Sequence, residues 1–308
     1  MNVLFISSGN NIWGISPIVK AQGESLIKKG LKIDYFLIKG KGLKSYFKHI
    51  FLLRKFVKDK NYVIYHAHYS FCGYVAALAG LKPLVVSLMG SDVKRILLQN
   101  FFLFLFYKLF WDLTIVKSAD MKKSLQFNKI IVLPNGVDSK LFNQSDKIIA
   151  KKKLKWDQQK KHILFPANPC RTEKNFKLAK SAFDSLFLKD VELHTLINVP
   201  YEIMPFYYNA SDVILLTSLW EGSPNVIKES LACNTVVVST NVGDVMEIIR
   251  DIEGCFITTF EVNDVADKLK LALKFNNKIN SREKIHHLFS EIIAEKLISY
   301  YKQFVNRS

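Results

Sequence analysis

The chain has 308 residues, 49% of them hydrophobic, and a formal net charge of +17 at pH 7. This length and this hydrophobic content suit two domains of ordinary size. The four cysteines lie far apart without paired spacing, which argues against a disulfide framework or a cysteine zinc site. The longest apolar stretch, residues 96–111, is interrupted by polar residues and is too short to span a bilayer. The N-terminus lacks the basic region of a signal peptide, so we expect a cytoplasmic protein.

The positive charge is concentrated in the first half. Residues 1–150 hold 22 Lys and Arg against 8 Asp and Glu, a net charge of +14, whereas residues 151–308 hold 22 against 19, a net charge of +3. The first half is therefore expected to face an anionic membrane surface, lipid phosphate or nucleic acid. Nucleic acid is disfavoured, because no nucleic-acid-binding module is recognisable and the aromatic residues fall mainly in apolar runs.

Short apolar runs alternate with helical periodicity in the first half. Asn2–Ser7 predicts a buried strand, and a loop with Gly9 and Gly14 leads to a helix over Pro17–Lys29 and a strand over Lys32–Ile38. In such a βαβ unit the loop lies at the carboxyl end of a strand, where open parallel sheets bind ligands. The other elements expected here are a basic amphipathic helix at 44–59, strands at 62–67, 84–88, 113–116 and 130–133, and an apolar helix at 96–110 that we expect to be the core helix of its domain.

Polar residues end two of these strands. His66 and His68 alternate onto one face, and Gly90-Ser91-Asp92 follows the strand at 84–88. Without cysteine or carboxylate companions, the two histidines are poor metal ligands and are more typical of packed or solvated side chains.

The second half repeats the pattern after a polar, lysine-rich segment, Gln144–Lys161, that we interpret as the interdomain hinge. Together the halves predict an α/β fold of two doubly wound domains facing across a cleft. We place the domains at residues 1–143 and 144–308, with the C-terminal helix packing back toward the first. The elements expected here are strands at 163–166, 192–199, 213–219 and 235–239 and helices at 176–188, 204–209, 262–275 and 281–305.

The stretch Glu221–Glu229 follows the strand at 213–219. Ser223 suits the N-cap and Pro224 the first position of a helix, so free amides from Ser223 to Val226 could bind a phosphate. The two carboxylates could accept hydrogen bonds from hydroxyl groups on either side, and a nucleotide sugar carries hydroxyls on both sides of a diphosphate. Taken alone, the pattern is more typical of acidic residues that only interact favourably with the helix dipole. In the two-domain context, ligand binding becomes the preferred interpretation.

The chain resembles the retaining glycosyltransferases of family four, which have the GT-B fold of two Rossmann-like domains. Glu221–Glu229 is similar to the family's Glu-seven-Glu motif, and Pro134–Asp138 to its Pro-Asn-Gly-Val-Asp segment. Arg171 and Lys174 look like the pair that clamps the donor diphosphate. His68 and the Gly90–Asp92 turn resemble positions on the acceptor side.

The resemblance implies a hexosyltransferase that moves a sugar, with retention, to a lipid-linked or cell-surface glycan acceptor in polysaccharide or lipopolysaccharide biosynthesis. Glu221 would contact the transferred sugar and Glu229 the ribose. No Asp-x-Asp occurs, so no metal or other cofactor is expected. The basic N-terminal half would attach peripherally to the inner face of the plasma membrane. The implied donor-binding residues also include Gly222, Ser223, Pro224, Asn225 and Val226, and those of the acceptor side are Gly9, His68, Ser91 and Asp92.

An alternative is a sugar-nucleotide-binding protein with weakened catalysis. It is suggested by Met89, which stands where many family members carry a histidine.

Overall fold

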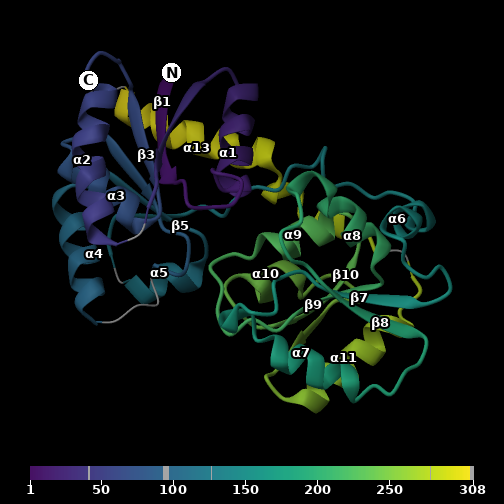
Figure 1. The fold of residues 1–308 in the computed structure, drawn as a ribbon. Helices are drawn as coiled ribbons and strands as arrows, with labels where there is room; N and C mark the ends of the chain where they lie inside the picture. The colour runs from purple at the N-terminus through teal and green to yellow at the C-terminus, as the bar shows by residue number, and fades with distance from the viewer. Residues whose placement is uncertain (41, 93–96, 126, 278, 306–308) are drawn as a thin grey trace. The chain divides into compact units, whose positions relative to one another are not determined.

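The computed structural model describes residues 1–40, 42–92, 97–125, 127–277 and 279–305. It contains two compact units (Figure 1). Unit 1 comprises Met1–Gly136 and Ser290–Ser308, and unit 2 comprises Val137–Phe289. Each unit is an α/β structure around a parallel sheet, so the predicted α/β class is confirmed.

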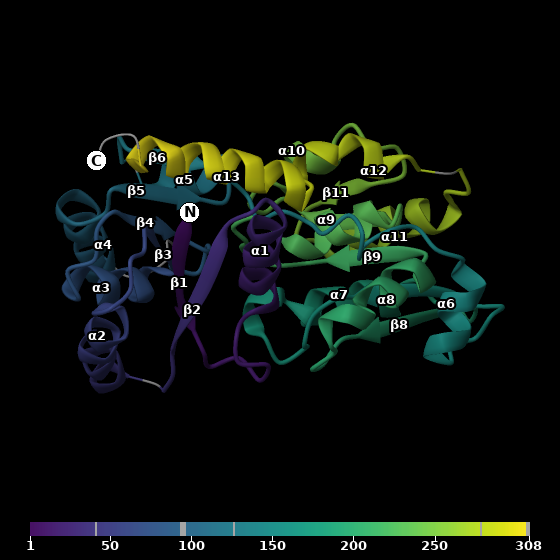
Figure 2. The same ribbon diagram turned by 90° about the horizontal axis from the view of Figure 1, so that it is seen from above.

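Unit 1 has a six-stranded sheet in the order β2-β1-β3-β4-β5-β6. Its helices cover both faces (Figure 2). The strands are β1 (Asn2–Ser8), β2 (Lys32–Ile38), β3 (Ile64–His68), β4 (Leu84–Ser87), β5 (Leu113–Val116) and β6 (Ile130–Val132), and the helices are α1 (Pro17–Lys28), α2 (Leu43–Val57), α3 (Ser70–Leu78), α4 (Leu97–Leu109), α5 (Ala119–Leu125) and α13 (Ser290–Val305).

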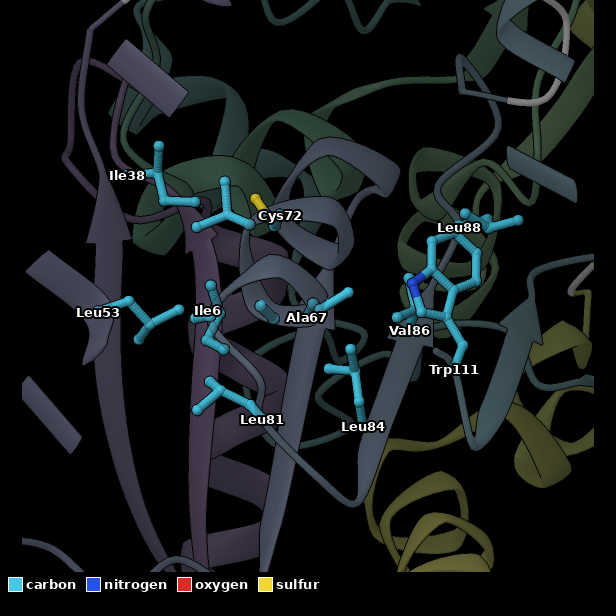
Figure 3. Packing of buried hydrophobic residues seen from close by; sticks show 14 of the residues in the cluster. Ile6, Ile38, Leu53, Ala67, Cys72, Leu81, Leu84, Val86, Leu88 and Trp111 are labelled. Atoms are coloured by element: carbon cyan, nitrogen blue, oxygen red, sulfur yellow. The ribbon is translucent and has the colours of Figure 1, made fainter. Parts of the chain in front are cut away.

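Side-chain alternation along β1 divides the core of unit 1 into two layers. Leu4 and Ile6 join the cluster under α2, α3 and α4, whereas Val3 and Phe5 join the cluster under α1 and α13. Figure 3 shows the first of these layers, in which Ile6, Leu53, Val86 and Trp111 belong to one buried cluster. Both faces of the sheet are therefore covered, as parallel sheets require.

Unit 2 has a five-stranded parallel sheet in the order β11-β10-β9-β7-β8, also buried on both faces. Its strands are β7 (Lys161–Phe165), β8 (Val191–Thr195), β9 (Val213–Leu216), β10 (Val236–Thr240) and β11 (Phe256–Thr258). Its helices are α6 (Lys147–Leu154), α7 (Phe176–Asp184), α8 (Met204–Ala210), α9 (Asn225–Ala232), α10 (Val245–Ile249), α11 (Val262–Lys274) and α12 (Ser281–Lys284), with 3-10 turns η1 (Thr172–Lys174), η2 (Tyr201–Ile203) and η3 (His286–Leu288).

The segment Gln144–Lys161, which was predicted as the interdomain hinge, instead lies within unit 2 and contains a helix. Residues 147–154 form α6, whose N-cap residue Asp146 accepts a hydrogen bond from the Ile149 amide at 2.9 Å. The predicted domain boundary at 143/144 differs from the observed one at 136/137. Val137 and Phe142, which are 1% and 0% exposed, pack in the core of unit 2. Unit 2 therefore begins before the predicted boundary.

The C-terminal tail is not the single helix predicted over 281–305. It consists of α12, the turn η3 and α13, and α13 belongs to unit 1. The sequence analysis also missed α3, α5, α10 and β11, which are short elements of three to nine residues. The predicted start of α4, Ile96, lies outside the described residues.

Candidate functional site

The stretch Glu221–Glu229 forms the turn after β9 and the first half of α9. The helix begins at Asn225, and Pro224 is its N-cap residue, with φ −69° and ψ 116°. The prediction of Ser223 as N-cap was therefore wrong by one residue, and the Ser223 hydroxyl instead accepts a hydrogen bond from Lys228 Nζ at 3.0 Å. The amides of Asn225 and Val226 lie in the first helical turn, where no preceding helical carbonyl is available to them.

A second turn packs tightly against this one. Gly243, which follows β10, has a φ of +61°, and a Cβ added there would lie 2.5 Å from the Gly222 carbonyl oxygen. The close approach of the two turns therefore depends on a glycine at 243.

Lys228 is fully buried, and burial lowers its pKa to about 8 although Asp244 and Glu229 act in the opposite direction.

Glu221 lies in an ion pair with Lys174. The Lys174 ammonium and the Ser218 hydroxyl, at 2.8 Å, both donate to Glu221 Oε1, and the side chains of the ion pair are 10% and 16% exposed. Lys174 ends η1, and the amide of Leu219 donates to the Glu173 carbonyl at 2.9 Å. Adjacent strands β7 and β9 thus bring together residues that are 47 positions apart.

Arg171 does not join this pair. Its side chain is 56% exposed and forms an ion pair with Glu173 at 2.6 Å. Of the two predicted diphosphate ligands, only Lys174 therefore lies at Glu221.

Glu229 is 3% exposed, and a tyrosine occupies each of its oxygens. Tyr201 donates to Oε1 at 3.0 Å and Tyr208 to Oε2 at 2.7 Å. Burial raises the pKa of Glu229, and the two tyrosine hydrogen bonds partly oppose this rise. An ionised carboxylate has about four acceptor positions, and the two tyrosine hydroxyls take two of them. The sequence analysis did not identify either tyrosine. Their spacing of seven residues, which places them on one side of a helical segment, could have pointed to them.

In unit 1, His68 ends β3 beside a cavity. The rings of His66 and His68 stack with centroids 4.3 Å apart, and both residues are buried. Burial, and then the charge of Lys117, lower the pKa of His68 to about 3, so its imidazole is neutral near pH 7. A cavity of about 320 Å³ is lined by polar residues of the β1 loop together with His68, Tyr69 and Met89. His68 and Met89 therefore line one cavity at the carboxyl edge of the sheet.

The remaining predicted acceptor residues shape the backbone around this edge. The Asp92 carboxylate accepts hydrogen bonds from the amides of Ser70, Met89 and Gly90 at 2.9–3.1 Å, and it is 5% exposed. Ser91 is exposed. The amide of Gly9 donates to the Ile38 carbonyl at 2.8 Å. Asp92 thus fixes the turn after β4.

Two glycosyltransferase family models match different parts of the chain. Residues 187–287 match the model described as Glycosyl transferases group 1, and residues 25–141 match Glycosyltransferase Family 4. Among solved structures, sucrose-phosphate synthase from Thermosynechococcus elongatus is 16% identical, with a TM-score of 0.85 and 100% of both chains covered. These findings support a family-four-type glycosyltransferase with the GT-B fold.

Other solved structures have a similar fold. A glycosyltransferase from Rickettsia africae is 15% identical, with a TM-score of 0.74 over 100% of this chain and 99% of that one. Anabaena HepE, solved in complex with UDP and glucose, is 14% identical, with a TM-score of 0.76 over 98% and 100%. A search of the curated proteins found no match.

Several buried polar atoms at these two sheet edges lack a partner. Among the residues that the structure describes, His68 Nε2, Asn225 Oδ1 and Asp244 Oδ1 are buried without a hydrogen bond. An unsatisfied buried polar atom costs about 1–3 kcal/mol. His68 Nε2 lies at the carboxyl edge of the unit 1 sheet, and Asn225 Oδ1 and Asp244 Oδ1 lie at the two turns of unit 2.

In the described part of the chain, one group of side chains could hold a metal ion. The ligand atoms of His162, Glu192 and His194 lie within 4.8 Å of one another on β7 and β8. His162 Nε2 lies 2.8 Å from the Asp157 carbonyl oxygen, which can only accept, so this nitrogen carries the proton. His162 Nδ1 is then an acceptor for His194 Nε2 at 2.9 Å. A hydrogen-bonded histidine pair accounts for this geometry.

Proposed function

We propose that this glycosyltransferase transfers a hexosyl group, with retention and without a metal ion, from a nucleoside-diphosphate sugar to a lipid-linked or cell-surface glycan acceptor. The observation that carries the proposal is the Lys174–Glu221 ion pair beside the first turn of α9. A buried cation, helix amides and a carboxylate are the groups that a diphosphate and an adjoining sugar require. The structure of Anabaena HepE with UDP and glucose supports a donor of this class.

The chemical step breaks the bond between the anomeric carbon and the diphosphate oxygen. The acceptor oxygen forms the new bond on the same face of the sugar, and its proton passes to the departing phosphate. Lys174 and the amides of Ser223, Asn225 and Val226 stabilise the negative charge that develops on the leaving group. Arg171 contributes once the diphosphate replaces Glu173 as its partner, while Gly222 and Pro224 shape the turn.

Glu221 and Glu229 take different parts of the donor in this proposal. Glu221 accepts hydrogen bonds from the transferred sugar, and Glu229 from the ribose. Because Tyr201 and Tyr208 hold the Glu229 carboxylate in place, it is oriented before the nucleotide binds. Such preorganisation lowers the entropic cost of binding.

The acceptor is assigned to unit 1, where His68 and Met89 line the cavity at the sheet edge. Lys44, Lys48 and Lys55 are exposed on α2, and we propose that they attach the enzyme to anionic lipid at the inner face of the plasma membrane. In the described residues, no helix has the length and apolarity needed to cross a membrane. Nucleic acid is not proposed as a partner.

A second candidate function is a sugar-nucleotide-binding protein with weakened catalysis. The observation that favours it is Met89 beside His68, because a thioether cannot accept or donate a proton at neutral pH.

A thermal-shift panel of UDP, GDP, ADP, CMP and their sugars tests donor binding, because a ligand stabilises the native state that it binds. The stabilising sugar nucleotide is then supplied with glycan and lipid-linked acceptors, with and without EDTA. We expect transfer that EDTA does not reduce and a product with the anomeric configuration of the donor by NMR. If a nucleotide binds and no acceptor is glycosylated, the second candidate is favoured. If no nucleotide stabilises the protein, both fail.

A further inference from the structure

The apolar helix α4 is only partly a core helix, which corrects the expectation from its sequence. Leu103 is 1% exposed and packs in the core under the sheet. Phe101, Phe102 and Phe104, however, are 59%, 47% and 45% exposed. The helix therefore presents phenylalanine rings to its surroundings as well as to the core.

The neighbouring helix α2 does the same. Phe47 and Phe51, one turn apart, are 59% and 68% exposed. Several exposed phenylalanines on two helices of one sheet face mark an interaction site more often than an isolated exposed leucine does.

An apolar groove lies between these helices and α3. It encloses about 380 Å³, and its apolar lining includes Phe47 and Ile50 of α2, Tyr74 and Leu78 of α3, and Phe102 and Phe106 of α4. Figure 2 shows α2, α3 and α4 side by side on one face of the unit 1 sheet. The volume suits a hydrocarbon chain or a small apolar ligand.

One end of the groove is polar and faces the sheet edge described above. Ser70 and Asp92 complete its lining. Ser70 begins α3 directly after β3, and Asp92 lies in the turn after β4, so both stand at the carboxyl edge. The groove thus extends along α3 from Leu78 to the edge that holds His68.

Lysines flank the groove along α2. At about 100° per residue, Phe51 lies about 40° around the helix axis from Phe47, and Lys44, Lys55 and Lys48 follow at about 60°, 80° and 100°. Ile50 lies about 60° away in the opposite direction, toward the groove. All three lysines are exposed, and α2 begins just after β2 at the carboxyl edge. A positive stripe therefore runs beside the apolar lining and starts near the predicted acceptor residues.

We propose that this groove binds the hydrocarbon chain of an anionic amphiphile, the lipid carrier of the acceptor, while the Lys44–Lys48 end of the stripe meets its phosphate. The inference rests on the proposed transfer to a lipid-linked acceptor and identifies the part of unit 1 that binds the lipid. The apolar groove suits the hydrocarbon chain of a lipid phosphate, and the lysines beside it suit the phosphate group. The glycan attached to that phosphate then lies toward the carboxyl edge of the sheet.

The first test measures the binding of alkyl phosphates below their critical micelle concentrations by isothermal titration. Each methylene that enters the groove is expected to raise affinity about fourfold, so dodecyl phosphate should bind on the order of 100-fold more tightly than octyl phosphate. Inorganic phosphate should bind more weakly than either. Equal affinity for dodecyl phosphate and inorganic phosphate would overturn the proposal.

Variants localise the site. Phe47→Asp and Phe102→Asp change exposed side chains and should each weaken dodecyl phosphate binding at least tenfold. Phe260→Asp is the matched control in unit 2, because Phe260 is 49% exposed, and it should bind like the wild type. Changing Lys44 and Lys48 to Glu should weaken octyl and dodecyl phosphate equally and leave the dependence on chain length unchanged. An equal loss in Phe260→Asp would also overturn the proposal.

Two other occupants are separated by the same variants. If sedimentation shows a dimer that Phe47→Asp abolishes, and dodecyl phosphate neither binds nor dissociates it, the groove is covered by a second copy. If Phe47→Asp loses only liposome binding and soluble dodecyl phosphate does not bind, the surface inserts into a bilayer. Either result rejects the lipid-carrier assignment.

Thermal stabilisation by nucleotide shows separately whether the proposed function fails. The groove variants should keep the thermal stabilisation by nucleotide, because they leave unit 2 unchanged. Nucleotide binding that is absent while alkyl phosphate binds would reject the transferase and leave an anionic-lipid site.

Discussion

The carboxyl edges of the two sheets carry opposite kinds of polar groups. In unit 2 the groups are charged and paired within the site, as in the contact of Lys174 with Glu221. In unit 1 the charged groups Lys117 and Asp92 are hydrogen-bonded to Ser87 and to backbone amides, and the histidine at the strand end is neutral. His68 is uncharged near pH 7, and the Asp92 carboxylate accepts three backbone hydrogen bonds. Two parallel sheets of similar topology therefore offer quite different chemistry through the residues at their strand ends.

Under the proposed function, this difference would let one fold hold two dissimilar substrates. A diphosphate can take over the partners of paired charges, so the edge of unit 2 suits an anionic donor. The edge of unit 1 pairs an unpartnered imidazole nitrogen with an apolar groove, which suits a hydroxyl acceptor on a lipid. The following experiments test the contrast from the strongest expected effect to the weakest.

Removing the buried cation of unit 2 should have the largest effect. Lys174→Ala is expected to lower kcat/KM on the order of 100- to 1000-fold, because a preorganised charge donor to the leaving group is lost. Arg171→Ala should lose less, since that side chain is exposed and paired with Glu173. Lys177→Ala, an exposed lysine on α7, is the control. Circular dichroism verifies the fold, and a Lys174→Ala variant within threefold of the wild type would contradict the assignment.

Reversing charges on unit 1 should abolish attachment to anionic membranes. Each Lys near an anionic leaflet contributes about 1 kcal/mol, so changing Lys44, Lys48 and Lys55 to Glu should weaken liposome binding on the order of 100-fold. The binding of the wild type should also weaken at high salt, because exposed charges are screened beyond about 8 Å at physiological ionic strength. Co-sedimentation with neutral and anionic liposomes measures both effects.

The matched control for the charge reversal lies in unit 2. Exposed Lys177, Lys270 and Lys274 are changed to Glu together, which gives the same change in net charge. This variant should bind anionic liposomes better than the unit 1 variant does. Equal binding by the two variants, or equal wild-type binding to neutral liposomes, would show that α2 is not the attachment surface.

The close contact between the two turns of unit 2 should fail with one methyl group. Gly243→Ala places a Cβ 2.5 Å from the Gly222 carbonyl oxygen and also carries the strain of a positive φ. Gly30→Ala carries only the strain, since its φ is +86° and nothing lies within 4 Å. We expect a loss of about 1–2 kcal/mol in unfolding free energy for Gly30→Ala and a larger loss for Gly243→Ala. Nucleotide affinity should fall only in the latter, as titration calorimetry would measure.

The two carboxylates should separate binding from turnover. Glu229→Gln is expected to weaken binding of the nucleoside diphosphate about tenfold, because one charge-assisted hydrogen bond to the ribose is lost. Glu221→Gln should mainly lower kcat, because its contact with the reacting sugar strengthens in the transition state. Tyr201→Phe should resemble a mild Glu229→Gln. Loss of affinity in the Glu221 variant alone would reverse the two roles.

The parts of the fold predictable from sequence were those with local signals. Alternation of apolar runs located most strands, and Pro17 and Gly30 bounded α1 within a residue. The lysine-rich α6 was missed because its polar composition was interpreted as a linker and its capping residue was not considered. Asp146 caps its start, and Lys155 adopts the left-handed conformation at its end.

The same distinction applies to the candidate site. Glu221 and Glu229 stand out because strand, turn and helix follow one another along the chain. Tyr201 and Tyr208 did not stand out, since they lie 28 and 21 residues from the carboxylate that they contact. Lys174 was predicted from the family resemblance, but its contact with Glu221, 47 residues away, depends on the strand order β9-β7, which periodicity alone does not specify.

The last prediction concerns the neutral histidine of unit 1. The pKa of His68 is lowered to about 3 by burial and Lys117, against about 6.5 in an unfolded chain. Between these pH values the unfolded state binds a proton that the folded state lacks. The free energy of unfolding should therefore fall by about 1.4 kcal/mol per pH unit for this group as pH decreases below 6.5.

Other groups contribute to the same window, so only a variant isolates His68. Burial lowers the pKa of His194 to about 4, with the same sign, whereas it raises the pKa of Asp92 and Glu229, with the opposite sign. Urea titrations at pH 7, 6 and 5 compare the wild type with His68→Gln, whose stability should depend less steeply on pH. His287→Gln, at an exposed position, should keep the wild-type slope. Equal slopes in all three proteins would mean that the His68 imidazole gains a proton in the folded state.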